Sequence, residues 1–91
     1  MTVKNPTIQS SSVLVVDDTE MNRDMLSTLV EADGHKVETA ENGKQALEKL
    51  RVGSYDLVLL DIEMPEMNGY EVLERCLQDD ELRNIPIIMT S

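Results

Sequence analysis

Three carboxylates in this sequence stand where two apolar runs end, and such groups can hold a cation or accept a phosphoryl group. The run VLVV, residues 13–16, leads into Asp17 and Asp18, and the run LVLL, residues 57–60, leads into Asp61. A charged group at the rim of a core costs free energy unless a partner compensates it. We therefore expect each of these carboxylates to have a partner.

The chemistry that fits these groups is metal-assisted phosphoryl transfer. Two full charges about 4 Å apart repel by roughly 4 kcal/mol at an effective dielectric of about 20, and a cation removes that conflict. Mg²⁺ suits oxygen ligands and shares its shell with phosphoryl groups. A carboxylate can accept a phosphoryl group, so Asp61 is the candidate nucleophile and Asp17 and Asp18 are candidate ligands. Thr90 follows the run IPIIM at 85–89, and its hydroxyl could reach a phosphoryl oxygen on Asp61.

Each of these acidic residues also has a purely structural interpretation. Asp18 or Thr19 could cap the helix that follows, and Asp61 could cap a turn before Pro65. Taken singly, the structural and functional interpretations are equally good. Two acidic strand ends in one suitable topology favour the functional cluster.

Apolar patterns indicate the elements that must position these groups. Residues 13–16, 57–60 and 85–89 are continuously apolar, which is typical of strands buried on both faces of a parallel sheet. Residues 36–40 alternate and predict a strand nearer an edge. Helical stripes lie between the strands at Met21, Met25, Leu26, Leu29 and Val30, at Ala46, Leu47 and Leu50, and at Val72, Leu73, Cys76 and Leu77.

Two Asn-Gly pairs predict helix N-termini. Asn42 and Asn68 each stand three residues before Gln45 or Glu71, a capping-box arrangement. Asn-Gly also signals hairpins, but the helical stripe that follows favours caps. The resulting order is β-α-β-α-β-α-β, which predicts one doubly wound α/β domain. Ligands of such sheets bind at the carboxyl ends of the strands, where the acids converge if the first and third strands are neighbours.

Composition excludes several functions. The net charge of −10, from 8 basic and 18 acidic residues, disfavours direct contact with nucleic acid or anionic lipid. The sequence has no Trp or Phe to stack on bases. Cys76 is the only cysteine, so we expect an inert core thiol and a reducing compartment. With no membrane span or signal peptide indicated, we expect a soluble cytoplasmic protein.

The motifs VLVVDD, DIEMPEMNG and PIIMTS, in this order, resemble the receiver domain of bacterial two-component response regulators. The resemblance runs from about Val13 to Ser91. It implies a receiver domain over residues 12–91 that follows a flexible lead-in or linker over 1–11. It also implies a flavodoxin-like parallel sheet with the strand order 2-1-3-4, truncated after the fourth strand; that order comes from the resemblance and not from the apolar pattern.

The resemblance assigns a role to each candidate residue. Asp61 would accept a phosphoryl group from a histidine kinase or phosphotransfer protein, and the chain would be a signalling module and not an enzyme. Asp18 would bind Mg²⁺ directly, Asp17 directly or through water, and Glu63 through its backbone carbonyl. Thr90 would supply the hydroxyl that moves toward the phosphoryl group.

The sequence departs from the family pattern at its end. Receivers continue with another helix, a fifth strand ending in Lys-Pro and a last helix, whereas this sequence stops at Ser91. The cationic partner of the phosphoryl group then has no counterpart, and the fourth strand would present an unpaired edge. We therefore expect a fragment that binds Mg²⁺ weakly and associates with itself through that strand. None of Lys4, Lys36, Lys44 and Lys49 corresponds to that family lysine, because all four belong to other elements.

Two other functions are open. A dehalogenase-like aspartyl-phosphate phosphatase would need a second Asp two residues after Asp61, where this sequence has Glu63, and it would need a cap domain. A degenerate receiver could instead be a non-phosphorylated interaction module, which the missing Lys favours and the intact acids disfavour. The sequence does not indicate the kinase, the output domain or the effector.

Overall fold

The structure, a computed structural model, describes residues 11–90. Residues 1–10 of the expected lead-in and Ser91 therefore lie outside the described residues. Strands and helices alternate in the predicted order: β1 (Ser12–Val16), α1 (Glu20–Ala32), β2 (Lys36–Ala40), α2 (Gly43–Val52), β3 (Leu57–Asp61), α3 (Gly69–Leu77) and β4 (Ile87–Thr90).

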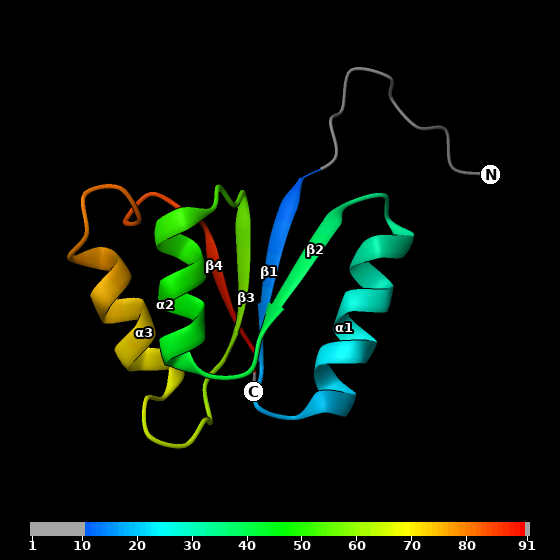
Figure 1. The fold of residues 1–91 in the computed structure, drawn as a ribbon, viewed down its shortest axis with the longest axis horizontal. Helices are drawn as coiled ribbons and strands as arrows, with labels where there is room; N and C mark the ends of the chain where they lie inside the picture. The colour runs from blue at the N-terminus through cyan, green and yellow to red at the C-terminus, as the bar shows by residue number, and fades with distance from the viewer. Residues whose placement is uncertain (1–10, 91) are drawn as a thin grey trace.

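The four strands form one parallel sheet in the order β2-β1-β3-β4. This order confirms the doubly wound, flavodoxin-like class. In this class β2 is added on one side of β1, and β3 and β4 are then added on the other side. All four arrows in Figure 1 point the same way, so the carboxyl ends of the strands meet at the lower edge of the sheet. Val16, the last residue of β1, lies opposite Ala40 on one side and Leu60 on the other.

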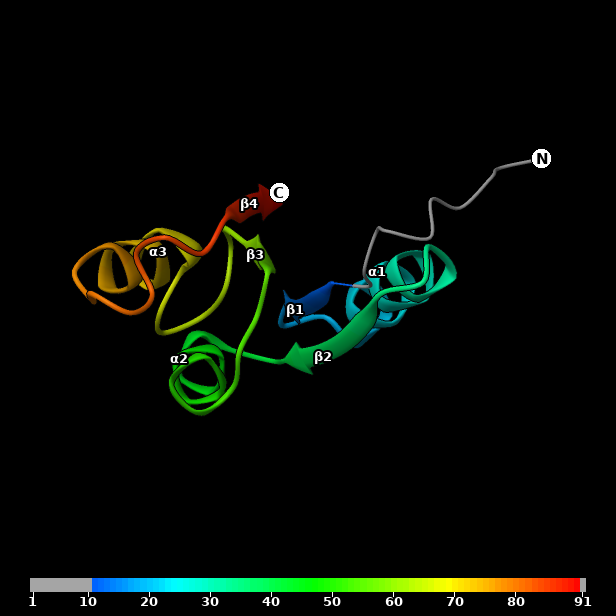
Figure 2. The same cartoon turned by 90° about the horizontal axis from the view of Figure 1, so that it is seen from above.

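Helices cover both faces of the sheet, as Figure 2 shows: α1 lies on one face, and α2 and α3 lie on the other. The main core forms under α2 and α3. It contains the fully buried side chains of Leu14, Leu60, Val72 and Cys76, which confirms the expected core position of the thiol. Among residues 11–90, no helix has the length and apolar character that crossing a bilayer requires.

The expectation of strands buried on both faces is correct for β1 and only partly correct for β3 and β4. Leu57 and Leu59 are half-buried, and Ile88 is 53% exposed. The reason is that α1 packs on β1 and β2 and leaves the β3–β4 part of its face uncovered among the described residues. The fourth strand also begins at Ile87 and not at Ile85.

The apolar stripe of α1 is the largest departure from the sequence pattern. Met21, Met25 and Leu29 are 78%, 54% and 62% exposed, and Leu26 and Val30 are only half-buried. The helix has no fully buried residue. The packing of α1 on β1 and β2 therefore covers only part of this stripe among residues 11–90.

Both predicted Asn caps are present. The Asn42 side-chain oxygen accepts the Gln45 N–H at 2.8 Å, and the Asn68 oxygen accepts the Glu71 N–H at 3.0 Å. The Gln45 side chain reaches back to the N–H of Glu41, at 3.1 Å, and not to that of Asn42. These caps fix where α2 and α3 begin, next to the carboxyl ends of β2 and β3.

Candidate functional site

The carboxyl ends of β1 and β3 bring Asp17, Asp18 and Asp61 together. One carboxylate oxygen from each lies within 4.8 Å of the other two. Among the polar residues that the structure describes, Asp17 and Asp61 are buried, at 4% and 7% exposure, whereas Asp18 is exposed. The cluster therefore opens to solvent on one side while two of its charges lie at the rim of the core.

Backbone hydrogen bonds hold the first of these acids in place. The Asp17 N–H donates to the Ala40 carbonyl at 3.1 Å, which extends the β1–β2 pairing by one residue. Its carboxylate accepts the Thr19 N–H at 2.8 Å, so the side chain closes a turn that leads into α1. Asp18 lies at the tip of this turn, and that position explains its exposure.

Asp61 is held in a similar way. Its carboxylate accepts the Glu63 N–H at 3.1 Å, and the next residue, Ile62, donates its N–H to the Thr90 carbonyl at 3.0 Å. Gly69 approaches from the other side, with its N–H 2.9 Å from the Ile62 carbonyl. The β3–α3 loop is therefore packed directly on the backbone that carries Asp61.

The structural interpretation of these acids is partly realised. Asp61 does cap a turn through one oxygen, but a turn does not require the convergence of three carboxylates. The capping of α1 by Asp18 or Thr19 is not supported, because Thr19 occupies the N-cap position without a side-chain capping bond. Turn formation therefore does not account for the cluster.

The electrostatics of the cluster favour a cation. Burial raises the pKa of Asp61, and the negative charges of Asp17 and Asp18 raise it further, while the Glu63 N–H opposes the shift. A divalent ion would reverse this effect by neutralising the acids. The donor set consists of oxygens alone, which fits a hard cation such as Mg²⁺.

The other candidate residues lie around this cluster. Thr90 is half-buried and stands opposite Asp61 in the β3–β4 register. Glu63 is exposed, and its carboxylate is not part of the three-acid group. The role of its backbone carbonyl stays a prediction.

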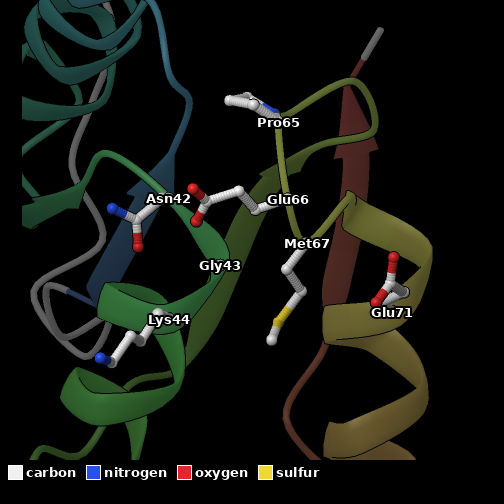
Figure 3. A pocket seen from close by; sticks show the side chains of 7 residues that line it. All are labelled: Asn42, Gly43, Lys44, Pro65, Glu66, Met67 and Glu71. Atoms are coloured by element: carbon white, nitrogen blue, oxygen red, sulfur yellow. The ribbon is translucent and has the colours of Figure 1, made fainter.

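The described lysines belong to other elements, as expected. Lys36 begins β2, at the end of the sheet away from the acids, and the Lys49 ammonium donates to the Thr39 carbonyl. Lys44 lines a separate pocket between α2 and the β3–α3 loop, where the Glu66 carboxylate points toward the start of α2 (Figure 3). That pocket contains none of the three aspartates, so we do not include it in the site.

Sequence reasoning missed Arg23. Its side chain is 13% exposed, and Nη1 donates to the backbone carbonyl of Asp17 at 2.8 Å. The signal that could have found it is its position as the first basic residue after the acidic pair, in the first turn of the predicted helix. The sequence pattern gives no indication that this side chain turns back toward the strand.

Comparisons with known proteins agree with this geometry. A family model described as the response regulator receiver domain matches residues 13–91. The polar-differentiation response regulator DivK of Brucella anthropi is 43% identical over 77 residues, which are 85% of this chain and 63% of that protein. DivK of Brucella ovis is 39% identical, over 87% of this chain and 64% of that protein. The chain thus spans slightly less than two thirds of these relatives.

Solved structures show the same fold. The N-terminal domain of a response regulator receiver protein from Methanoculleus marisnigri superposes with a TM-score of 0.87 at 43% identity, over 89% of this chain and 66% of that one. The Vibrio cholerae chemotaxis protein CheY4 superposes with a TM-score of 0.84 at 33% identity, over 91% and 72% of the two chains. Both likenesses cover about nine tenths of this chain.

Proposed function

The chain belongs to the response regulator receiver domain family, and on that premise we propose that it is a phosphoacceptor signalling module. A histidine kinase or phosphotransfer protein would donate the phosphoryl group to Asp61. The observation that carries the proposal is the convergence of the Asp17, Asp18 and Asp61 oxygens within 4.8 Å of one another at the carboxyl edge of the sheet.

The proposed step is a transfer between two side chains. A carboxylate oxygen of Asp61 attacks phosphorus in line, an O–P bond forms, and the P–N bond to the donor imidazole breaks with its electron pair returning to the ring nitrogen. Asp61 must be ionised to attack, and the neighbouring acids that raise its pKa oppose this. Compensation of those charges is therefore part of the function.

The acids of this chain would hold Mg²⁺ for that purpose. Asp17, Asp18 and Asp61 would contribute carboxylate oxygens, and Glu63 would contribute its backbone carbonyl. When bound, the ion neutralises charge on the phosphoryl oxygens. The hydrogen bonds from Thr19 and Glu63 to Asp17 and Asp61 orient the carboxylates before any ion binds.

Thr90 would report that the phosphoryl group has arrived. Its hydroxyl would donate to a phosphoryl oxygen on Asp61, the residue opposite it in the sheet. This contact exists only in the phosphorylated state, so it shifts the population between two conformations of β4 and its surroundings. The result is a signal and not turnover of a substrate, in the cytoplasm where histidine kinases present their phosphoryl groups.

The open edge of β4 supports the further proposal of self-association. Within residues 11–90, β4 pairs with β3 alone, and its Ile88 side chain is 53% exposed. An edge strand with free N–H and C=O groups is a template for pairing with a second copy. The partner at this edge would be another molecule of this chain.

A mass measurement tests the phosphoacceptor. The wild-type chain is incubated with a small-molecule phosphodonor and Mg²⁺, and we expect one phosphoryl adduct by intact mass. Asp61→Asn should show none, while Asp80→Asn, a matched change at an exposed site, should behave as wild type. A wild-type chain that stays unmodified at every donor concentration would reject the proposal and favour a non-phosphorylated interaction module.

A further inference from the structure

We propose that Arg23 is a positioning residue for the metal-binding carboxylates, because it fixes the peptide that joins Asp17 to Asp18 and ties that loop to the start of α2. The part of this inference that concerns Mg²⁺ rests on the proposed function. The part that concerns the loop does not, since the contacts are present without any ion.

The contact with Asp17 is the stronger of the two. The Nη1 group of Arg23 donates to the Asp17 carbonyl oxygen at 2.8 Å, and the side chain is only 13% exposed. A hydrogen bond from a charged, largely buried donor is stronger than a neutral one. The same carbonyl belongs to the peptide whose N–H is that of Asp18, so this bond fixes the plane from which the Asp18 side chain departs.

Asp17 is thereby held on three sides. Its N–H donates to Ala40 at 3.1 Å, its carboxylate accepts from Thr19 at 2.8 Å, and its carbonyl accepts from Arg23. Loss of the Arg23 bond would free the peptide to rotate. Because Thr19 donates to the carboxylate of Asp17 across that same peptide, rotation would loosen both acids of the pair.

The second contact reaches the neighbouring loop. Nη2 of Arg23 lies 3.7 Å from a carboxylate oxygen of Glu41, whose other oxygen accepts from the Gln45 side chain at 3.2 Å. Gln45 lies in the first turn of α2. Glu41 is 60% exposed, so this ion pair is screened by solvent and is the weaker link.

Only a guanidinium can make both contacts. Its planar fork presents several N–H groups in fixed directions, whereas an ammonium is a point charge on a flexible stem. We therefore expect Arg23→Lys to lose most of the effect.

Arg23 could affect Mg²⁺ binding through its charge or by positioning the acids, and these two roles predict opposite changes in affinity when the side chain is removed. If Arg23 acted only through its positive charge, removing it would make the site more negative and tighten Mg²⁺ binding. If it positions the acids, removing it weakens binding. Changes of residues that orient metal ligands typically cost 10–100-fold in affinity, so we expect Arg23→Ala to bind Mg²⁺ at least about 10-fold more weakly.

Two measurements on the full chain separate this inference from the proposed function. In the metal-free protein, amide exchange followed by NMR should be faster at Thr19 in Arg23→Ala than in wild type. A Mg²⁺ titration on the same samples then gives the affinities. Arg83→Ala is the matched control, because it removes one arginine charge from an exposed ion pair with Asp80 and should leave both readings unchanged.

The outcomes are distinct. Two results for Arg23→Ala would overturn the positioning role. One is a Thr19 amide exchange rate equal to that of the wild type, and the other is Mg²⁺ binding that is unchanged or tighter. If the wild type shows no Mg²⁺ binding in the titration, that result counts against the proposed function. The amide exchange rate of Thr19 would still decide the role of Arg23. If Arg23→Ala does not fold, Arg23→Lys carries the test, because it keeps the positive charge and loses the planar fork: Mg²⁺ binding weaker than in the wild type would support the positioning role, and equal binding would overturn it. Glu41→Gln should weaken Mg²⁺ binding by less than about fivefold.

Discussion

Asp61 and Thr90 are direct neighbours across the parallel β3–β4 ladder, and each is the last residue of its strand. The Ile62 N–H, one residue beyond Asp61, donates to the Thr90 carbonyl at 3.0 Å. This pairing holds the two backbones together while the Thr90 side chain stays half-buried. A change at Asp61 therefore has a short route to the edge strand.

We predict that the Thr90 hydroxyl couples phosphorylation to the response of β4. Thr90→Val should still accept a phosphoryl group, with a change in stability within about 1 kcal/mol because the site is only half-buried. Its β4 amide resonances should no longer shift on phosphorylation, whereas Thr90→Ser should retain the shifts. Equal shifts in the Val variant and the wild type would contradict the role.

Asp61 should lower the stability of the metal-free protein at neutral pH. Burial and the charges of Asp17 and Asp18 raise its folded pKa above the ordinary value of 3.8. Between these two values the folded state binds more protons than the unfolded state, so stability falls as the pH rises through the raised pKa. Asp61→Asn removes this cost and should stabilise the metal-free protein by roughly 1 kcal/mol, or about 4–8 °C in Tm.

The pH profile of that difference is the check. In thermal unfolding, the difference in Tm between Asp61→Asn and the wild type should be largest at neutral pH. It should shrink on acidification and vanish once the pH is below the ordinary carboxyl pKa. Asp80→Asn, at a site that is 93% exposed, should show no such difference. An Asn variant that melts below the wild type at neutral pH would contradict the predicted repulsion.

Mg²⁺ should stabilise the folded chain and reverse the effect of the crowded acids. A free ligand concentration of about 100 times Kd stabilises a protein by about 2.7 kcal/mol when the ligand binds the folded state alone. We expect Tm to rise with added Mg²⁺ and to return on chelation with EDTA. Asp17→Asn should abolish most of the rise. A rise that survives this change would place the ion elsewhere.

Gly69 should be essential for the packing of the β3–α3 loop. A Cβ atom at this position would overlap with the Asp61 carbonyl oxygen and lie 2.9 Å from the Ile62 Cα. Both are backbone atoms that cannot rotate away, so Gly69→Ala should destabilise the protein by about 1–3 kcal/mol. Glu74→Ala, on the exposed face of the same helix, is the control in denaturant unfolding and should cost much less.

If β4, whose outer edge is unpaired among residues 11–90, pairs with a second copy as proposed, association should depend on concentration. Ile88→Lys places a charge on this edge, which disfavours strand pairing between copies. Light scattering should show that the wild type grows in mass with concentration and that the Lys variant stays closer to a monomer. A wild type that remains monomeric throughout would rule out association through β4.

The sequence alone determined the elements and their order, because hydrophobic period and capping are local properties of the chain. Asn42 and Asn68 marked the starts of α2 and α3, and the apolar runs before Asp17 and Asp61 marked strand ends that carry acids. The pattern did not give the strand order. That came from the resemblance to receivers, and the sheet confirms it.

Only the tertiary structure decided which surfaces meet. The apolar pattern of α1 did not reveal that Met21 would be 78% exposed, because burial depends on which strands lie beneath a helix. The sequence likewise gave no sign that Arg23 would join Asp17 to Glu41, since that contact spans two loops that only the parallel sheet brings together. Short-range preferences fix the segments, whereas long-range packing fixes the distances between their side chains.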